Sequence, residues 1–313
     1  MKHRINPIVD CVFKALLGSE KNKNLLIHFL NAIIDFQDED KITDVVVMNP
    51  YNEREFIDDK LSVVDIKAKC QNDFKYQVEI QLAVYPALSS RIVYNWSTIY
   101  HSQLTKKGAY KELKPVFSIW ILENPLFKDV DNYHLKFGLH DVKNNIALSD
   151  HLTIHLLQLS HFDDNKDICN EAERWLYFFK KAENQDIDNL PEVLNTKEMK
   201  QAMETLQDFS ENQKNYLLYQ SRLDAIYERN TLEQMRRETE IELSLARQHI
   251  AKTTKEIEKA TKEIEKATKE AEKATKEVEK ERAEKEKAIK EKEIYLKILK
   301  EKGIDIDSLN LSS

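Results

Sequence analysis

The sequence is short of the residues that break helices and cross-link loops. Its 313 residues include only 4 glycines, 6 prolines and 3 cysteines. Scarce glycine beside abundant Glu, Lys and Ala indicates a large helical content. Cys11, Cys70 and Cys169 are widely spaced and odd in number, so we expect neither a disulfide framework nor a cysteine metal site. A reducing compartment is consistent with this usage.

Long apolar runs and cofactor motifs are also missing. No stretch of about 18 apolar residues occurs, so we expect no membrane span. The first residues, MKHRINPIVD, have no apolar core of a signal peptide, and we expect a cytoplasmic protein. The histidines lack zinc-binding spacing, and neither GxGxxG nor a P-loop occurs, so no nucleotide cofactor is expected.

The net charge of −7 does not indicate nucleic-acid binding. A protein of negative net charge can nevertheless bind nucleic acid through a local basic surface.

The composition changes near residue 230. Before it the chain is mixed and rich in aromatics; residues 232–302 are nearly all Glu, Lys, Ala, Thr and Ile. The word EKATKE begins at Glu258, Glu265 and Glu272, a repeat of seven residues. We therefore predict a core domain over 1–160, a helical extension over 161–230, a heptad-repeat helix over 231–302 and a short tail over 303–313.

The repeat has the spacing of a coiled coil. The a and d positions are filled, three and four residues apart, by Ile257, Ala260, Ile264, Ala267, Ala271, Ala274 and Val278. Alanine at d makes a thin seam, and threonine at e opposite glutamate at g gives no ion pairs between helices. Glu258–Lys262 and Glu265–Lys269 favour a single helix instead. The pattern predicts either a homo-oligomer through residues 232–302 or a solvated spacer.

The first part alternates helix and strand signals. Asn6 as N-cap, Pro7 and a stop at Gly18 predict a helix over 7–17. Apolar spacing predicts a second helix over 25–34. Further elements are expected as a strand at 42–50, two strands within 61–82, a helix at 87–104, a strand at 114–123, strands within 130–160 and helices within 170–230.

Residues 61–82, LSVVDIKAKCQNDFKYQVEIQL, read as a hairpin with acids inside its apolar strands. A three-residue loop at 71–73 sets Cys70 opposite Phe74 and therefore Asp65 opposite Glu79, with Val63 opposite Gln81. The polar side chains then share one face: Asp65, Lys67, Gln77, Glu79 and Gln81. Directly opposed carboxylates repel each other. The pattern therefore predicts either a divalent cation that bridges them or a sheet face exposed to water, where the acids are solvated.

Several ordered motifs resemble the PD-(D/E)xK nuclease superfamily and, more narrowly, its recombination-promoting nuclease/transposase (Rpn) family. NPIVDCVFKALLGSEKNKNLLIHFLNAII resembles the family's opening, with Asp10, Phe13, Lys14 and Gly18 in its pattern. DDKLSVVDIKAK and VEIQL resemble its second and third strands, and RIVYNWSTIYHSQLTKKGAYKELKPVFSIWIL the segment that follows. The resemblance covers residues 1–125 closely and the part to 230 loosely. It implies a restriction-endonuclease-like α/β core, a mixed sheet flanked by helices.

The resemblance also implies metal-dependent cleavage of DNA with Mg²⁺ or Mn²⁺. Asp65 would be the acid of the "PD" motif, with Val64 in place of its proline, and Glu79 the second metal-binding acid. Gln81 stands where the superfamily places lysine, which removes a positive charge near the attacking water. Lys67 is the nearest candidate for a relocated catalytic lysine, and Lys60 is more remote.

Further residues are candidates for the same site. Asp10 is a candidate for an additional metal ligand or for a surface or capping acid. Arg91 and Tyr94 are candidates for contacting phosphate or for supporting the site, and a structural arginine is the other reading of Arg91. Lys106 and Lys107 belong to the densest basic stretch of this part and could contact the DNA backbone. The predicted function is a magnesium-dependent DNA endonuclease, linked to recombination or mobile elements. The alternative is a catalytically weakened DNA-binding or assembly protein that oligomerises through its coiled coil.

Overall fold

The computed structural model describes residues 2–36, 38–48, 65–104 and 108–302. Contacts divide the chain into two compact units, Met1–Arg229 and Asn230–Ser313. The first unit holds the sheet and most helices, and the second continues a long helix. Helices after residue 160 share the core of the first unit. The predicted boundary between a core and a helical extension there stays a prediction.

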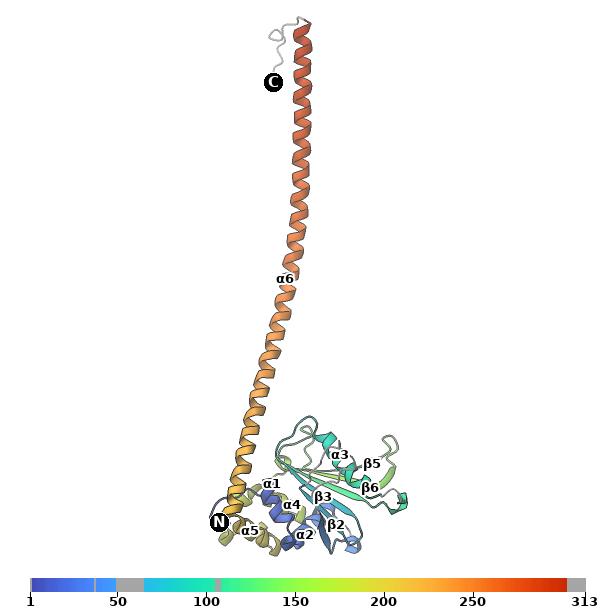
Figure 1. Ribbon diagram of the computed structural model, residues 1–313, viewed down its shortest axis with the longest axis vertical. Helices are drawn as coiled ribbons and strands as arrows, with labels where there is room; N and C mark the ends of the chain where they lie inside the picture. The colour runs from blue at the N-terminus through green and yellow to red at the C-terminus, as the bar shows by residue number, and fades with distance from the viewer. Residues whose placement is uncertain (1, 37, 49–64, 105–107, 303–313) are drawn as a thin grey trace. The chain divides into compact units, whose positions relative to one another are not determined.

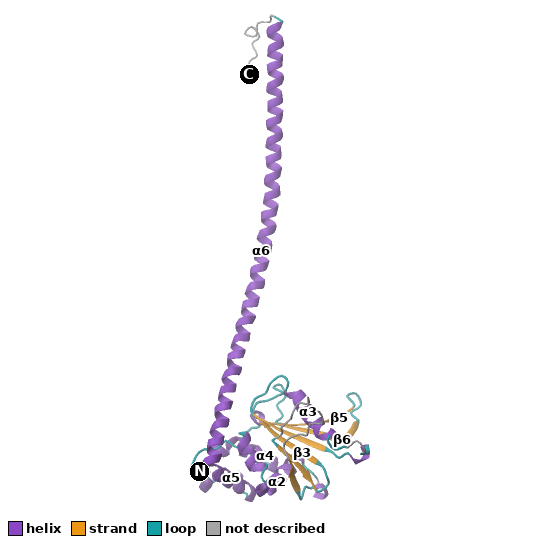
Figure 2. Ribbon diagram, in the orientation of Figure 1, coloured by secondary structure: helices purple, strands orange, loops and turns teal. Residues whose placement is uncertain are grey.

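The first unit is built on a six-stranded mixed sheet (Figure 2). In spatial order the strands are β1 (Val45–Met48), β2 (Ile66–Cys70), β3 (Lys75–Gln81), β4 (Val116–Leu122), β6 (Ala147–Gln158) and β5 (His134–His140). β3 pairs with β4, and β4 with β6, in parallel, whereas the other neighbours are antiparallel. The predicted α/β fold with a mixed sheet is confirmed.

Six α-helices accompany the sheet in the described residues. They are α1 (Asp10–Leu17), α2 (Lys23–Ile34), α3 (Leu88–His101), α4 (Glu171–Lys181), α5 (Lys197–Glu211) and α6 (Gln213–Glu301). Figure 1 shows α1, α2, α4 and α5 grouped together, with α3 apart from them. Short 3₁₀ turns occur at Glu20–Asn22, Asp38–Asp40, Tyr110–Glu112, Leu159–His161, Ala182–Asn184, Ile187–Asn189 and Glu192–Leu194.

Two apolar clusters cover the two faces of the sheet. The larger joins α1, α2, α4 and α5 to one face, around Phe29, Trp175 and Tyr76. The smaller joins α3 to the other face through Leu88 and Trp120. Every residue of β4 is buried, because this strand is covered on both sides. Since side chains alternate along a strand, the polar residues of β3 lie on the α3 face.

The first helix begins at Asp10 rather than at residue 7, so the predicted start was wrong. Asn6 lies three residues before Val9, the N-cap residue, and makes two contacts. Its side-chain oxygen accepts a hydrogen bond from the Ile8 N–H at 3.1 Å, and its own N–H donates to the Tyr219 hydroxyl at 3.1 Å. Asn6 therefore makes a local hydrogen bond of the kind a capping residue makes, although regular helix begins only after Val9.

Gly18 follows the last residue of α1, as predicted. A Cβ atom there would lie 2.8 Å from the Lys14 carbonyl oxygen and 3.3 Å from Ile66 Cγ1. Only glycine allows this approach without a shift of helix or strand. It brings the end of α1 against the start of β2.

The remaining expected elements occur with small changes of length. The predicted strands at 42–50 and 114–123 shorten to β1 and β4, and the helix at 87–104 shortens to α3. The region 130–160 holds β5 and β6. The partner of Gln81, Val63, and the remote candidate Lys60 lie outside the described residues. Within the described ranges, no helix combines the length and apolar character needed to cross a bilayer.

Candidate active site

The β2–β3 hairpin has the predicted register. Ile66 pairs with Val78 and Lys67 with Gln77. The loop closes through the Cys70 N–H, which donates to the Phe74 carbonyl at 3.1 Å, and through Asp73, whose φ of 64° is left-handed. Continuing the register by one residue sets Asp65 opposite Glu79. The two acids therefore lie opposite each other, Asp65 just before the start of β2 and Glu79 within β3.

Asp65 is held by both of its carboxylate oxygens. Oδ2 accepts a hydrogen bond from the Ile80 N–H at 2.8 Å, and Oδ1 lies 3.2 Å from Lys14 Nζ. The side chain is only 12% exposed. Burial raises the pKa of Asp65 above its ordinary value, Asp10 adds to the rise, and the Ile80 N–H and Lys14 oppose it. The ionised form is thus costly and depends on these donors.

Glu79 is almost completely enclosed by hydrogen-bond donors. Its Oε1 accepts from Gln77 Nε2 at 3.2 Å and from Asn95 Nδ2 at 3.3 Å, and its Oε2 lies 3.4 Å from Arg91 Nη2. The side chain is 3% exposed. Burial, followed by repulsion from Asp65, raises the pKa of Glu79 to about 8. A further cation nearby would favour its ionised form.

Gln81 and Arg91 form one connected group beside the acids. Arg91 Nη1 donates to Gln81 Oε1 and to the Tyr85 hydroxyl, each at 3.3 Å. Gln81 Nε2 donates to the Ala83 carbonyl at 2.9 Å. The guanidinium also stacks over Trp120, 5.6 Å from the ring centroid. Gln81 therefore orients an arginine and supplies no charge of its own.

A pocket of about 270 Å³ brings these residues together with α6. Its polar lining consists of Asp10, Asp65, Glu79, Gln81, Arg91, Arg222 and Arg229, and its apolar lining of Ile8, Ile80, Leu82, Ala225 and Ile226. Arg222 Nε lies 3.6 Å from Asp10 Oδ2. Acids from α1 and the hairpin thus face arginines from α3 and α6.

Other predicted site residues lie elsewhere. Lys67 is 7% exposed in β2, and Tyr94 is 45% exposed on α3; neither is among the described residues that line the pocket. Lys106 and Lys107 lie outside the described residues. Their predicted roles therefore stay predictions.

Three basic residues at the site were not assigned a role from the sequence. Lys14 follows Asp10 by four residues, so both lie on one face of α1. Arg222 and Arg229 are seven residues apart and share a face of α6, with Ala225 and Ile226 between them. Two arginines one heptad apart, with small or apolar residues between them, could have indicated that this basic face of the helix packs against the core.

The donor set suits a hard divalent cation. Mg²⁺ binds to oxygen, requires only one or two carboxylates and retains several waters. Asp65 and Glu79 meet that requirement, and the pKa of each is raised chiefly by burial and further by a neighbouring carboxylate. Among the described residues, no group of three or more His, Cys, Asp or Glu is placed to hold a metal ion. Asp10 is paired with Arg222, so its role as a third ligand stays a prediction.

A larger pocket, of about 1050 Å³, lies between α2, the strands β5 and β6, and the start of α4. Its lining includes His134 and His155, whose Nε2 and Nδ1 atoms are 2.8 Å apart. His155 Nε2 is buried without a hydrogen-bond partner in the described part of the chain. Burial, and then His134, lowers the pKa of His155 to about 3. Neither Asp65 nor Glu79 lines this pocket.

Comparison with known protein families gave one match, and the matched part of the chain includes the smaller pocket. Residues 7–235 match the family described as PD-(D/E)XK nuclease family transposase. This span contains every residue of the pocket lining, from Ile8 to Arg229. Comparison with curated proteins gave no match, and comparison with solved structures gave none either.

Proposed function

Because the chain belongs to the PD-(D/E)XK nuclease family of transposases, we propose that it is an endonuclease that hydrolyses DNA phosphodiester bonds with a divalent metal ion. Family membership agrees with the resemblance found in the sequence. The observation that carries the proposal is the pair Asp65 and Glu79, opposed across a hairpin in a pocket that also holds three arginines. Carboxylates bind hard metal ions, and guanidinium groups bind phosphate oxygens.

Asp65 and Glu79 are the proposed metal-binding residues, with Mg²⁺ or Mn²⁺ as the ion. Such an ion, when bound, polarises a phosphoryl oxygen and lowers the pKa of a bound water. The Ile80 N–H fixes Asp65 Oδ2, and Gln77 with Asn95 fixes Glu79 Oε1. Each carboxylate therefore has one oxygen held by neutral donors and the other beside a cationic side chain.

Arg91, Arg222 and Arg229 are the proposed phosphate-binding residues. A guanidinium presents several N–H donors in a plane and matches phosphate oxygens well. Arg91 is fixed by Gln81 and Tyr85, whereas Arg222 is 52% exposed at the pocket. Together they would hold the DNA backbone over the acids.

Lys14 is the proposed source of the positive charge that Gln81 lacks. Its ammonium group lies 3.2 Å from Asp65, and it lowers the pKa of both Asp65 and Glu79. This position beside the acids fits a residue that stabilises the developing negative charge. Lys67, the candidate from the sequence, competes with it for this role.

A second function follows from Gln81 itself. Both ends of its amide are engaged, with Arg91 and with the Ala83 carbonyl. If no other side chain replaces the missing lysine, the pocket would bind DNA with little or no cleavage. Metal-independent DNA binding without nicking would favour this alternative.

Nicking of supercoiled plasmid tests the proposal. The wild-type chain, Asp65→Asn, Glu79→Gln and Asp73→Asn would be compared with Mg²⁺, with Mn²⁺ and with a chelator. Asp73→Asn is the matched control, because Asp73 lies in the same hairpin, pairs with Lys69 at its exposed turn and is outside the pocket.

We expect the wild type and Asp73→Asn to nick equally, and only with metal. Asp65→Asn and Glu79→Gln should be inactive while remaining folded. Equal nicking by wild type and Asp65→Asn would refute the assignment of the site. Absence of nicking by a folded wild type would refute the endonuclease function in favour of the binding alternative.

A further inference from the structure

The second unit exposes a regular apolar stripe along α6. Its large residues recur at intervals of seven and are each 50% to 66% exposed: Leu243, Ile250, Ile257, Ile264 and Val278. Ala271 fills the remaining position of the series. On an isolated helix these side chains stay in contact with water and add no burial energy to stability. Because they line up along one side of the helix, a partner could bury them all at once.

We propose that this stripe is the seam of a parallel, in-register coiled coil formed with a second copy of the chain. The stripe residues occupy the a positions. The d positions hold small residues: Ala246, Thr253, Ala260, Ala267 and Ala274. β-branched residues at a favour two strands when leucine fills d. Because alanine or threonine fills d here, the a residues would supply most of the apolar area buried in the seam.

The threonines beside the seam are already satisfied within their own helix. At the e positions, Thr254, Thr261 and Thr268 each donate a hydroxyl hydrogen bond of 2.9 Å to the carbonyl of the a residue four positions earlier. Thr275 does the same at 2.8 Å. These hydroxyls need no partner from a second helix, so placing them at the edge of a seam leaves no donor unpaired.

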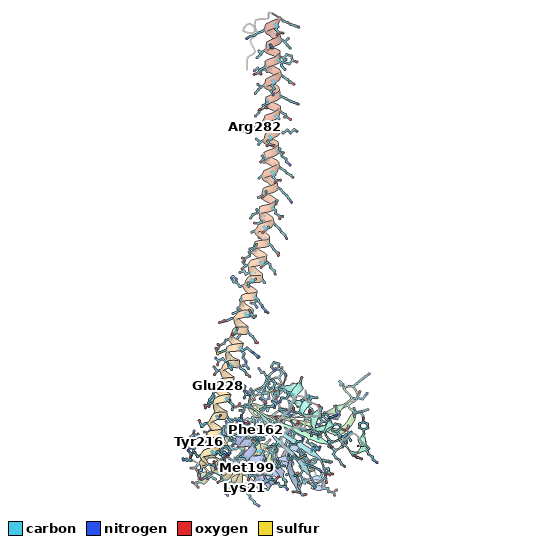
Figure 3. All side chains as sticks on the ribbon, viewed as in Figure 1. Lys21, Phe162, Met199, Tyr216, Glu228 and Arg282 are labelled. Carbon is cyan, nitrogen blue, oxygen red and sulfur yellow. The ribbon has the colours of Figure 1, made fainter. Side chains whose placement is uncertain are left out.

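Charges at the two ends of the seam support a parallel arrangement. In a parallel coiled coil, a g residue of one helix faces the e residue five positions later on the other. Glu242 would face Arg247 of the second copy, and Glu277 would face Arg282 of the second copy. Arg282 lies along the exposed part of α6 in Figure 3. Opposite charges thus meet at both ends, and glutamates face threonines between them.

The antiparallel alternative brings like charges together, because g then faces g and e faces e. Glutamate fills most of the g positions along the stripe: Glu242, Glu256, Glu263, Glu270 and Glu277. The g positions of two antiparallel helices would therefore set glutamate against glutamate. A parallel slip by seven residues would separate both of the favourable end pairs. Charge complementarity therefore selects the parallel, in-register dimer.

The length of the seam and its parallel direction determine where the two copies are joined. It ends after Val278, because the next two a positions are Lys285 and Lys292. From Leu243 to Val278 it would extend about 54 Å. In a parallel dimer both copies of the first unit join the same end of the coil. This inference does not depend on whether the pocket cleaves DNA.

Sedimentation of the full chain over the micromolar range tests dimer formation. We expect a mass twice the 36.8 kDa of the chain. The double variant Ile257→Gln, Ile264→Gln should raise the dissociation constant at least about a hundredfold, because four buried isoleucines per dimer are lost. The control Lys262→Gln, Lys269→Gln changes the outer f positions and should leave it unchanged. A monomeric wild type, or equal weakening by the control, would overturn the proposal.

The orientation is tested by reversing one charge. Glu277→Arg places two arginines together in the parallel dimer and should weaken it about tenfold. In an antiparallel dimer the same change would set the introduced arginine against a g glutamate of the second copy and tighten association. Adding Arg282→Glu should restore the parallel dimer. Tighter association of Glu277→Arg, or failure of the second change to restore it, would overturn the parallel, in-register arrangement.

Discussion

The carboxylate of Asp65 accepts a hydrogen bond of 2.8 Å from the backbone N–H of Ile80, the residue after Glu79. One acid of the pair is therefore fixed by the backbone that carries the other. A change in the hairpin register would break this bond and separate the two carboxylates. Asp65 thus has a structural role that can be measured apart from any catalytic one.

Asp65→Ala and Asp65→Asn should differ in stability. Alanine leaves the Ile80 N–H without an acceptor and should lower the free energy of unfolding by about 1–3 kcal/mol. Asparagine keeps an acceptor and removes a buried charge, so it should be at least as stable as wild type in chelator. Urea unfolding measures both, with Asp73→Asn as control. Equal stability of the two variants would contradict the role of the Ile80 bond.

Lys14→Gln and Lys67→Gln separate the two candidate lysines. Lys14 lies beside Asp65, so its loss should lower the rate of DNA cleavage about a hundredfold. Lys67→Gln should leave the rate of the folded protein within a few-fold. Lys21→Gln is the control, because Lys21 is exposed and pairs with Asp208 outside the pocket. A large loss in Lys67→Gln alone would instead assign the catalytic lysine to β2.

Arg222→Gln and Arg229→Gln should each weaken DNA binding and reduce its salt dependence. Removing one phosphate contact lowers the slope of log affinity against log salt by about one. Fluorescence anisotropy with a labelled duplex, in an Asp65→Asn background, measures this slope without cleavage. Arg237→Gln on the exposed surface of α6 is the control. If Arg237→Gln reduces the slope as much, the two pocket arginines have no special role.

His155 should make the protein less stable in acid. Its pKa is about 3 in the folded chain, against an ordinary value of 6.5, because it is buried and lies beside His134. Below pH 6.5 the unfolded chain takes up the proton and the folded chain does not. The free energy of unfolding therefore falls as the pH drops from about 6.5 toward about 3, and this contribution is fully present above that range.

His155→Leu should reduce this acid sensitivity. The free energy of unfolding at pH 7 and pH 5 is measured for both proteins, and the difference should shrink in the variant. It should not vanish, because burial also lowers the pKa of His134. His140→Leu, at an exposed position, should leave the difference unchanged. An unchanged difference in His155→Leu would contradict the buried, neutral state of this histidine.

Local signals in the sequence were sufficient for the hairpin. A three-residue loop determines the register, and the register alone places Asp65 opposite Glu79. The amphipathic helix α2 was predictable for the same reason, because its buried residues follow one helical period. These features depend on neighbours within a few residues.

Features set by distant contacts were not predictable. Arg222 and Arg229 reach the acids only because α6 packs beside α1, and the acids lie far earlier in the chain. The contact of Asn6 with Tyr219, 213 residues later in the chain, was likewise outside the reach of local signals. The single helix from 213 to 301 was also missed, since the change of composition near 230 resembled a boundary.

The seven-residue repeat of α6 allows the length of the second unit to vary without a change of phase. Each seven-residue repeat adds about 10.5 Å of helix and rotates the chain to within about 20° of two full turns. Gain or loss of a whole repeat would keep the same residues in the stripe. An insertion of one or two residues would instead rotate the residues that follow it out of the stripe. The reach of this helix is therefore adjustable in steps, independently of the residues at the pocket.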